Sequence, residues 1–319
     1  MEASTTFVDA VDKTQIFTRI WLPTGTPKAV LHILHGMAEH SERYSTTAEY
    51  FTQLGYAVYA HDHRGHGETA TSANELGHYA DNKGWDLVVS DVYSVNQFAR
   101  SRHHGLPIFI FGHSMGSFIT YGFLQAHPNL VDGVILSGSA FQAGLLVQSA
   151  NRVAKLERFR QGPRGRSKLM DFLTFSSFNK PFKKNGNTDF DWLSRDPAEV
   201  NKYIEDPKCS FIATNQTWVD LSSGLLKIFS QKKFATLPKE IPYYVFSGSM
   251  DPVGNNGKAI GLLLSKLNEI GVKNIEKHIY PEGRHEMLNE INRHEVLEDL
   301  SHWTEKQVEK IMKSKEVAA

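Results

Sequence analysis

The chain has 319 residues, of which 40% are hydrophobic and 22% are charged, and its 35 Lys and Arg balance its 35 Asp and Glu. A chain of this length buries roughly three quarters of its unfolded surface, which excludes general disorder. Zero net charge argues against a nucleic-acid partner. The single cysteine, Cys209, excludes an intrachain disulfide and a cysteine-rich zinc site.

The start of the chain and its hydropathy predict where the protein acts. Residues 1–13 carry acidic residues where a signal peptide would carry basic ones, and they lack an apolar stretch. No segment approaches the 18 uninterrupted apolar residues that a spanning helix requires. We therefore expect a cytoplasmic protein.

The predicted elements alternate along the chain. An antiparallel hairpin of 5–10 and 15–22 comes first, and strands are then predicted at 29–35, 56–62, 107–112, 133–137, 243–247 and 275–280. Helices are predicted at 46–54, 85–102, 115–126, 257–270 and 293–313. The later strands are short and rich in Val, Ile, Phe and Tyr, as strands buried on both faces are. The order predicts an α/β fold with a mostly parallel central sheet and helices on both faces.

One segment breaks this alternation. Residues 141–232 contain no strand signal over 92 positions, which is far too long for a structureless connection. The segment holds nine of the 19 Phe residues together with Trp192 and Trp218. We predict a core domain of residues 1–140 and 233–319 and a helical, aromatic-rich cap of residues 141–232.

The strongest chemical signal is Gly112-His113-Ser114-Met115-Gly116. It follows an apolar strand and opens an apolar helical pattern, which is the context that a nucleophilic serine on a sharp strand-to-helix turn requires. The glycines suit a turn in which backbone segments approach closely. Ser114 is therefore predicted to be a nucleophile at the carboxyl edge of the sheet.

A nucleophilic serine needs a base and an orienting carboxylate. Asp251 follows the strand at 243–247, and His285 follows the strand at 275–280, so both are expected at the same edge as Ser114. We predict that Ser114, Asp251 and His285 form a catalytic triad. Asp220 and Asp299 also flank apolar segments and are the alternative acids.

An acyl-transfer site also needs hydrogen-bond donors for the oxyanion. The backbone N–H of Met115, directly after the serine, is the predicted first donor. The second is the N–H of Met37, in the loop after the strand at 29–35. This chemistry requires no metal and no cofactor, and we expect activity to be unchanged by EDTA.

As a set, these motifs resemble the monoglyceride lipase and lysophospholipase branch of the α/β-hydrolase fold, of the S33 type. The resemblance rests on the motifs His35-Gly36-x-x-Glu39-His40-Ser41-x-Arg43-Tyr44, His61-Asp62-His63-Arg64-Gly65-His66-Gly67 and Gly112–Gly116, and on the segments of Asp251 and His285. It covers the chain from about residue 15 onward and is weakest in the insertion.

The resemblance implies hydrolysis of a single-chain acyl ester, such as a monoacylglycerol or a lysophospholipid, with the insertion as a cap over the site. Relatives of this type usually carry HGxGEH and GHSMGG, where this chain has Ala38 and Ser117. Both substitutes are small, so we expect the oxyanion hole to remain.

Other functions compete with this interpretation. His61, His63 and His66 beside Asp62 suggest a metal hydrolase, but Gly65 occupies the position of the aspartate in such a motif, which favours a hydrogen-bonded loop. An S33-type aminopeptidase or a small-molecule carboxylesterase would share the triad. A non-catalytic binding protein would not need all three residues. Cys209 is interpreted as a small buried residue.

Charge in the insertion predicts a peripheral membrane contact. Between Gly144 and Lys184, ten basic residues face two acidic ones, a local net charge of +8. Interleaved Leu and Phe residues suggest a cap that rests on an anionic lipid surface. The hypothesis predicts vesicle binding that falls with salt and with substitution of Arg158, Arg160, Arg164 and Arg166 by Gln.

Overall fold

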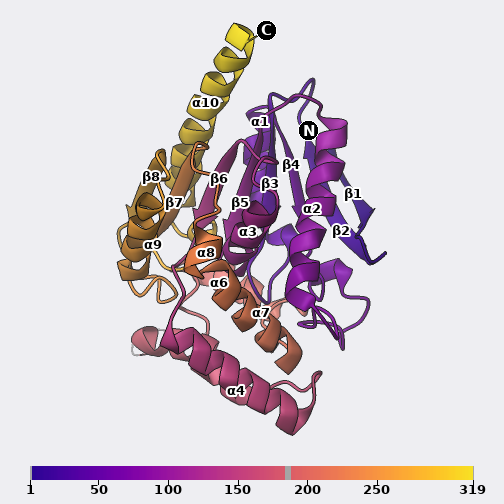
Figure 1. Cartoon of the computed structure of the whole chain (residues 1–319), viewed down its shortest axis with the longest axis vertical. Coiled ribbons are helices and arrows are strands. Elements are labelled where there is room, and N and C mark those ends of the chain that lie inside the picture. The colour runs from indigo at the N-terminus through magenta and orange to yellow at the C-terminus, as the bar shows by residue number, and fades with distance from the viewer. Residues whose placement is uncertain (1, 184–187, 319) are drawn as a thin grey trace.

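Eight strands form one sheet in the computed structural model of the chain, which describes residues 2–183 and 188–318. The strands are β1 (Glu2–Asp9), β2 (Gln15–Leu22), β3 (Ala29–Leu34), β4 (Tyr56–His61), β5 (Ile108–His113), β6 (Gly133–Ser137), β7 (Tyr243–Gly248) and β8 (Ile275–Tyr280). Their order is β1-β2-β4-β3-β5-β6-β7-β8, antiparallel as far as the β2–β4 pair and parallel beyond it (Figure 1). The predicted α/β sheet is confirmed. Among the strands, the largest difference between predicted and observed bounds is at β1, which begins at Glu2 rather than Thr5.

One strand differs from the expectation that the later strands are buried on both faces. Glu276 and Lys277 of β8 are exposed, and only Tyr280 at its end is buried. The reason is topological, because β8 is the edge strand and pairs only with β7.

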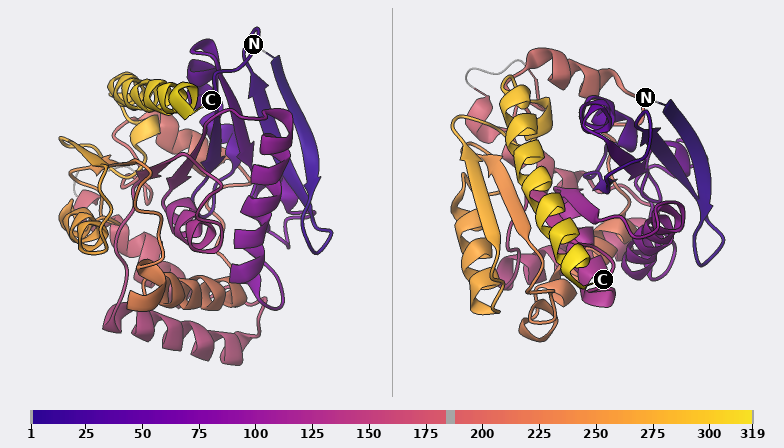
Figure 2. Two further views of the ribbon diagram at one scale, coloured as in Figure 1. Left: turned by 45° about the horizontal axis from the view of Figure 1, so that its top comes forward. Right: turned by 90° about the horizontal axis from the view of Figure 1, so that it is seen from above.

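Helices cover both faces of the sheet. The α-helices of the described residues are α1 (Ser45–Gln53), α2 (Gly84–Arg102), α3 (Met115–Ala126), α4 (Leu145–Gln161), α5 (Lys168–Asp171), α6 (Pro197–Glu205), α7 (Asn215–Ile228), α8 (Gln231–Phe234), α9 (Lys258–Glu269) and α10 (Arg293–Ala318). Side chains of α1 and α10 share a hydrophobic cluster with one face of the sheet, and those of α2, α3, α7 and α9 share another with the opposite face. Figure 2 shows the ribbons of α10 and α7 on different sides of the sheet. Among the described residues, no helix combines the length and hydropathy that crossing a bilayer requires.

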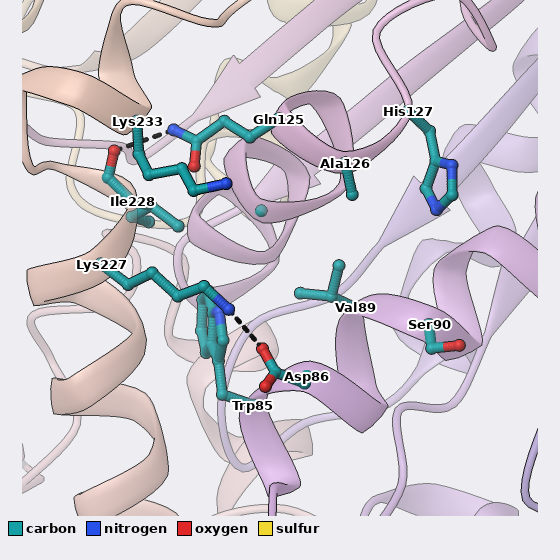
Figure 3. Close-up of a pocket in the computed structure, with 11 residues that line it drawn as sticks. Trp85, Asp86, Val89, Ser90, Gln125, Ala126, His127, Lys227, Ile228 and Lys233 are labelled. Atoms are coloured by element: carbon teal, nitrogen blue, oxygen red, sulfur yellow. Dashed lines mark hydrogen bonds and ion pairs between the residues drawn. The ribbon is translucent and has the colours of Figure 1, made fainter.

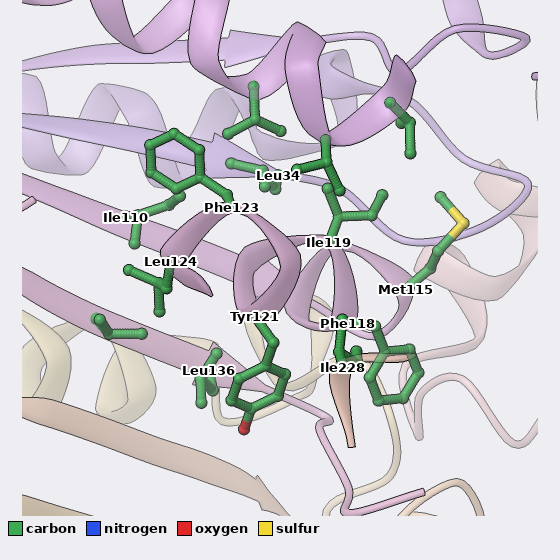
Figure 4. Packing of buried hydrophobic residues seen from close by; sticks show 14 of the residues in the cluster. Leu34, Ile110, Met115, Phe118, Ile119, Tyr121, Phe123, Leu124, Leu136 and Ile228 are labelled. Carbon is green, nitrogen blue, oxygen red and sulfur yellow. The ribbon is translucent and has the colours of Figure 1, made fainter. Parts of the chain in front are cut away.

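Helix α3, directly after the predicted nucleophile, is deeply buried. Its residues Met115 to Leu124 are all buried, because the helix lies between the sheet and helices α2 and α7. Figure 4 shows Ile119 and Phe123 toward Leu34 of β3 and Ile110 of β5, and Phe118 beside Ile228 of α7. This packing anchors the turn that precedes the helix.

The described residues of the segment 141–232 contain helices joined by turns and loops, and no strand, which agrees with the predicted helical character. Its helix α7 packs against α2 and α3, and α4 packs against α7 on the outside of the molecule (Figure 1). Within the segment, Phe182, Trp192, Leu193, Tyr203 and Cys209 form a hydrophobic cluster of their own. The division into a core of residues 1–140 and 233–319 and a cap of residues 141–232 stays a prediction.

Candidate active site

Ser114 lies on the turn between β5 and α3. Its backbone has φ 51° and ψ −120°, a conformation that costs a non-glycine residue on the order of 1–3 kcal/mol and that clusters at active sites. The Ser114 N–H donates to the Ser137 carbonyl at 2.9 Å, and the side chain is half-buried. The turn thus holds the serine at the carboxyl edge of the sheet.

The two flanking glycines are explained by close backbone contacts. A Cβ on Gly112 would lie 2.7 Å from the Gly116 carbonyl oxygen, and a Cβ on Gly116 would lie 2.2 Å from the Leu34 carbonyl oxygen. Real Cβ atoms essentially never come this close. The G-x-S-x-G pattern is therefore a packing requirement of this turn.

Asp251 and His285 are in direct contact. His285 Nδ1 lies 2.9 Å from Asp251 Oδ1, and both side chains are buried. Ser247 Oγ donates to Asp251 Oδ2 at 2.8 Å, and the Val253 N–H donates to Oδ1 at 2.9 Å. Burial alone would raise the pKa of Asp251, but the charge of His285 and these hydrogen bonds hold it below its usual value.

His285 comes close to the serine turn. Its ring centroid lies 4.7 Å from that of His113, the residue before Ser114. The ring centroid of Trp192, from the insertion, lies 5.0 Å from that of His285, and the backbone N–H of His285 donates to the Trp192 carbonyl. The structure therefore brings Asp251 and His285 together beside the Ser114 turn, under a residue of the predicted cap.

The alternative acids lie elsewhere. Asp220, on α7, accepts a hydrogen bond from Gln216 at 3.1 Å. Asp299, on α10, accepts one from the Tyr280 hydroxyl at 2.9 Å and lies beside His278. Of the three candidate aspartates, Asp251 is the one that contacts His285.

The loop predicted to supply an oxyanion donor lies against the serine turn. A Cβ on Gly36 would lie 3.3 Å from Ser114 Cβ, which places the loop beside the predicted nucleophile. Ala38 adopts φ 57°, in the left-handed region, so the chain turns sharply directly after Met37. Met115 is the first residue of α3, where helix N–H groups lack intrahelical partners. The assignment of Met37 and Met115 stays a prediction.

A buried ion network beside His285 was not predicted from the sequence. Arg43 Nη1 lies 2.9 Å from Glu39 Oε2 and 2.6 Å from Glu286 Oε1, and its Nη2 lies 2.7 Å from Glu286 Oε2. The Tyr44 hydroxyl donates to Glu39 Oε1 at 3.0 Å. The network joins the loop after β3 to the residue that follows His285. Glu39 and Arg43 lie four positions apart in the motif of residues 35–44, and this spacing was the sequence feature from which their ion pair could have been predicted.

These charges act on the predicted base. Burial lowers the pKa of His285, but the charge of Asp251, the hydrogen bond to Asp251 and the charges of Glu286 and Glu39 outweigh burial, so the pKa lies above its ordinary value of 6.5. Protonated His285 cannot accept the proton of Ser114. We therefore expect kcat/KM for a soluble ester to fall as the pH decreases through a value above 6.5, as measured in a pH–rate profile.

Two variants test this effect of charge on the pH–rate profile: Glu286→Gln removes a charge beside His285, and His127→Gln is the control. Removing the Glu286 charge should move the acidic limb of the profile to lower pH, because the protonated imidazole loses a stabilising neighbour. His127 lies at the far end of α3, and its substitution should leave the limb in place. A wild-type limb below pH 6.5 would contradict this electrostatic account.

The histidines of the second motif form a buried hydrogen-bonded chain. Ring nitrogens of His61 lie 3.1 Å from a ring nitrogen of His32 and 3.1 Å from one of His63. The backbone N–H of His63 donates to His35 Nε2 at 2.9 Å. Asp62 accepts from the Ser41 N–H, the Ser41 hydroxyl and the Glu68 N–H. These contacts tie the loop after β4 to the loop after β3 and give the motif a structural role.

A surface hollow of about 250 Å³ lies away from these residues. It sits between α2, α3, α7 and α8, and Figure 3 shows Lys227 on α7 paired with Asp86 on α2 and Gln125 on α3 bonded to the Ile228 carbonyl. Neither Ser114 nor His285 lines it. The chemistry described here does not use this hollow.

The parallel sheet, the serine turn at the end of β5 and the Asp–His pair after β7 and β8 define an α/β-hydrolase fold. The chain belongs to the Hydrolase_4 family, described as serine aminopeptidase, S33, whose profile matches residues 25–292. It is 28% identical to monoglyceride lipase of Rattus norvegicus over 289 residues, covering 88% of this chain and 86% of that protein.

A bacterial relative and a solved structure agree with this assignment. The chain is 27% identical to monoacylglycerol lipase of Mycolicibacterium smegmatis over 291 residues, covering 89% of this chain and 90% of that protein. Its structure is similar to that of a thermostable carboxyl esterase from Bacillus coagulans, with a TM-score of 0.88 and 25% identity over 97% of this chain and 99% of the esterase.

Proposed function

We propose that this protein is a carboxylic ester hydrolase that cleaves monoacylglycerols, with Ser114 as its nucleophile. The observation that carries the proposal is the buried Asp251–His285 pair, 2.9 Å apart, beside the left-handed turn that presents Ser114. The relatives named for monoglyceride hydrolysis cover most of the chain. A lysophospholipid is the second substrate of the same chemical class.

In the proposed mechanism, His285 removes the proton of Ser114 as the hydroxyl attacks the ester carbonyl. Asp251 holds the imidazole in the tautomer that can accept this proton and stabilises the imidazolium. The N–H groups of Met37 and Met115 donate to the oxyanion. Glycerol leaves with the proton from His285, and His285 then activates the water that hydrolyses the acyl-enzyme.

An aminopeptidase would need a carboxylate to bind the substrate amine. Three acidic residues of the insertion are engaged with other side chains: Glu157 with Arg160 and Ser167, Asp196 with Arg293, and Asp206 with His40. Glu39 and Glu286, beside His285, are paired with Arg43. This pairing of the nearby carboxylates favours an ester substrate.

The substrate class is tested by comparing monooleoylglycerol, lysophosphatidylcholine, p-nitrophenyl acetate and an aminoacyl 4-nitroanilide. We expect hydrolysis of monooleoylglycerol and of the short ester, and no release of nitroaniline, because Glu39 and Glu286, the carboxylates beside His285, are paired with Arg43 rather than free to bind a substrate amine. The Ser114→Ala variant provides the blank. Cleavage of the anilide without cleavage of monooleoylglycerol would contradict the proposal and favour the peptidase.

We also propose that the protein acts in the cytoplasm and docks on anionic membranes through α4. The outward side of this helix carries Leu145, Leu146, Leu156 and Phe159, which are 79%, 81%, 61% and 89% exposed. Arg152 and Lys155 are exposed on the same helix and make no hydrogen bond or ion pair within residues 2–183 and 188–318. An apolar stripe with basic neighbours is typical of helices that lie in the membrane interface.

The structure changes the choice of basic residues for the test. Arg164 pairs with Glu75, Arg166 bonds to the Leu76 and Ile212 carbonyls, Arg160 pairs with Glu157, and Arg158 donates to Gln216. Substituting these arginines would therefore remove contacts within the chain as well as surface charge. Lys184, which also contributed to the local charge, lies outside the described residues.

Vesicle flotation of a Leu156→Ser/Phe159→Ser variant tests the docking. Each buried apolar side chain contributes roughly 1.5–3 kcal/mol, so removing two should lower partitioning to anionic vesicles by at least about tenfold. Arg152→Gln/Lys155→Gln should weaken binding mainly at low salt. Turnover of p-nitrophenyl acetate should not change in either variant.

The matched control is Leu262→Ser/Ile291→Ser, which removes two exposed apolar side chains, 47% and 58% exposed, that lie outside the insertion. Vesicle binding by this control should equal that of the wild type. Absence of wild-type binding to anionic vesicles at low salt would overturn the docking proposal while leaving the esterase proposal intact.

A further inference from the structure

We propose that His40, Asp206 and Cys209 form a zinc-binding site that fastens the segment after α6 to the loop after β3. Their ligand atoms, one imidazole nitrogen, one carboxylate oxygen and one sulfur, all lie within 4.8 Å of one another. His40 Nε2 lies 2.8 Å from Asp206 Oδ2. His40 and Cys209 are buried, and the Asp206 side chain is 30% exposed.

The donor set suits zinc. Zinc binds imidazole nitrogen at about 2.0 Å, carboxylate oxygen at about 2.0–2.2 Å and thiolate sulfur at about 2.3 Å, so tetrahedral ligand atoms lie roughly 3.3–3.8 Å apart. The 2.8 Å between His40 Nε2 and Asp206 Oδ2 and the limit of 4.8 Å among all three atoms lie on either side of that spacing. Three protein ligands leave a fourth position for a water molecule, which can enter past the exposed part of Asp206.

Backbone hydrogen bonds hold the ligands together. The Lys208 N–H donates to Asp206 Oδ1 at 2.8 Å, which leaves Oδ2 directed at His40. The Cys209 N–H donates to the Asp206 carbonyl at 3.0 Å, and the Ser210 N–H donates to the Ala38 carbonyl at 3.0 Å. The ligands from the two segments are therefore brought together by contacts that need no ion.

The surrounding charge favours a dication. Four carboxylates lie in this region. They are Asp206, Glu39 and Glu286, the last two paired with Arg43, and Glu68, which is paired with Lys208. These four carboxylates and two cations leave a local charge of −2. The Cys209 thiol proton passes to solvent when sulfur coordinates the ion.

Such an ion would join parts of the chain that are far apart in sequence. His40 belongs to the loop that carries Met37, whereas Asp206 and Cys209 directly follow α6 of the predicted cap. Binding to the folded chain alone stabilises it, so free zinc at about 100 times Kd should raise Tm by several degrees. The mechanism proposed for ester hydrolysis assigns no role to this ion.

The test uses the full chain, first treated with EDTA and then freed of it. Titration with Co²⁺ should give one tight equivalent and a sulfur-to-cobalt charge-transfer band in the near ultraviolet, and Zn²⁺ should displace Co²⁺ and abolish the band. Cys209→Ser should lose the band, and Asp206→Asn should weaken binding by about 10-fold or more while each variant keeps a cooperative melting transition.

Asp299→Asn is the matched control, because His278, Glu295 and Asp299 form a second, more exposed group of possible ligands. This variant should bind one equivalent of Co²⁺ and show the same charge-transfer band as the wild type. Absence of a charge-transfer band in the wild type, or unchanged tight zinc binding by both Cys209→Ser and Asp206→Asn, would overturn the proposal. Loss of binding in Asp299→Asn alone would also overturn it and move the site to α10.

Discussion

Ser114→Ala should lower kcat for p-nitrophenyl ester hydrolysis on the order of 10⁴-fold or more, because the acyl-enzyme cannot form without the hydroxyl. The side chain loses one oxygen, and the left-handed backbone is held by the Ser114 N–H bond to Ser137 and by the packing of α3. We therefore expect the melting temperature to change little. The measurement is steady-state turnover of wild type and variant under identical conditions.

Ser117→Ala provides the matched control one helical turn further on. Ser117 Oγ donates to the Ser114 carbonyl and lies 2.8 Å from Ser139 Oγ, so its loss removes hydrogen bonds but no reacting group. Its kcat should stay within about tenfold of the wild type. If Ser114→Ala retained more than about a hundredth of wild-type kcat, the nucleophile assignment would be wrong.

Asp251→Asn should have the second largest effect. The side chain is fully buried and bonded to His285, Ser247 and Val253, and an amide of the same shape keeps the fold but no longer fixes the reactive imidazole tautomer. We expect kcat to fall by about 10⁴-fold with KM changed far less. Stopped-flow kinetics with a p-nitrophenyl ester measures both quantities.

The alternative acids supply the comparison. Asp220→Asn and Asp299→Asn each alter one aspartate that bonds to residues other than His285. Both variants should retain most of the wild-type kcat. A mild effect of Asp251→Asn together with a severe effect of Asp220→Asn would reassign the orienting acid to the insertion.

The sheet and the positions of the predicted triad were accessible from the sequence for a topological reason. Parallel strands place their carboxyl ends at one edge, so Ser114, Asp251 and His285, each after a recognisable apolar strand, were expected at the same edge. The contact between Asp251 and His285 agrees with that expectation. The exposure of β8 could not be predicted from its local composition, because its position at the edge of the sheet decides which of its side chains are buried.

Long-range side-chain pairing could not be read from local patterns. Arg43 and Glu286 are 243 residues apart, and only the fold brings them within 2.6 Å. In the same way, the sequence indicated no partner for the arginines of the insertion, whereas in the structure Arg164 and Arg166 contact the chain between β4 and α2. Charge counts predict a local net charge, but not which charges remain available to a partner.

Covalent labelling tests the central claim most directly. The protein is incubated with a long-chain alkyl p-nitrophenyl phosphonate, which resembles the tetrahedral intermediate of ester hydrolysis, and is then digested and analysed by mass spectrometry. The account predicts one phosphonyl group per chain, on the peptide that contains Ser114, in parallel with the loss of monooleoylglycerol hydrolysis. Complete loss of that activity with the label on any other residue, or full labelling of Ser114 with activity retained, would contradict it.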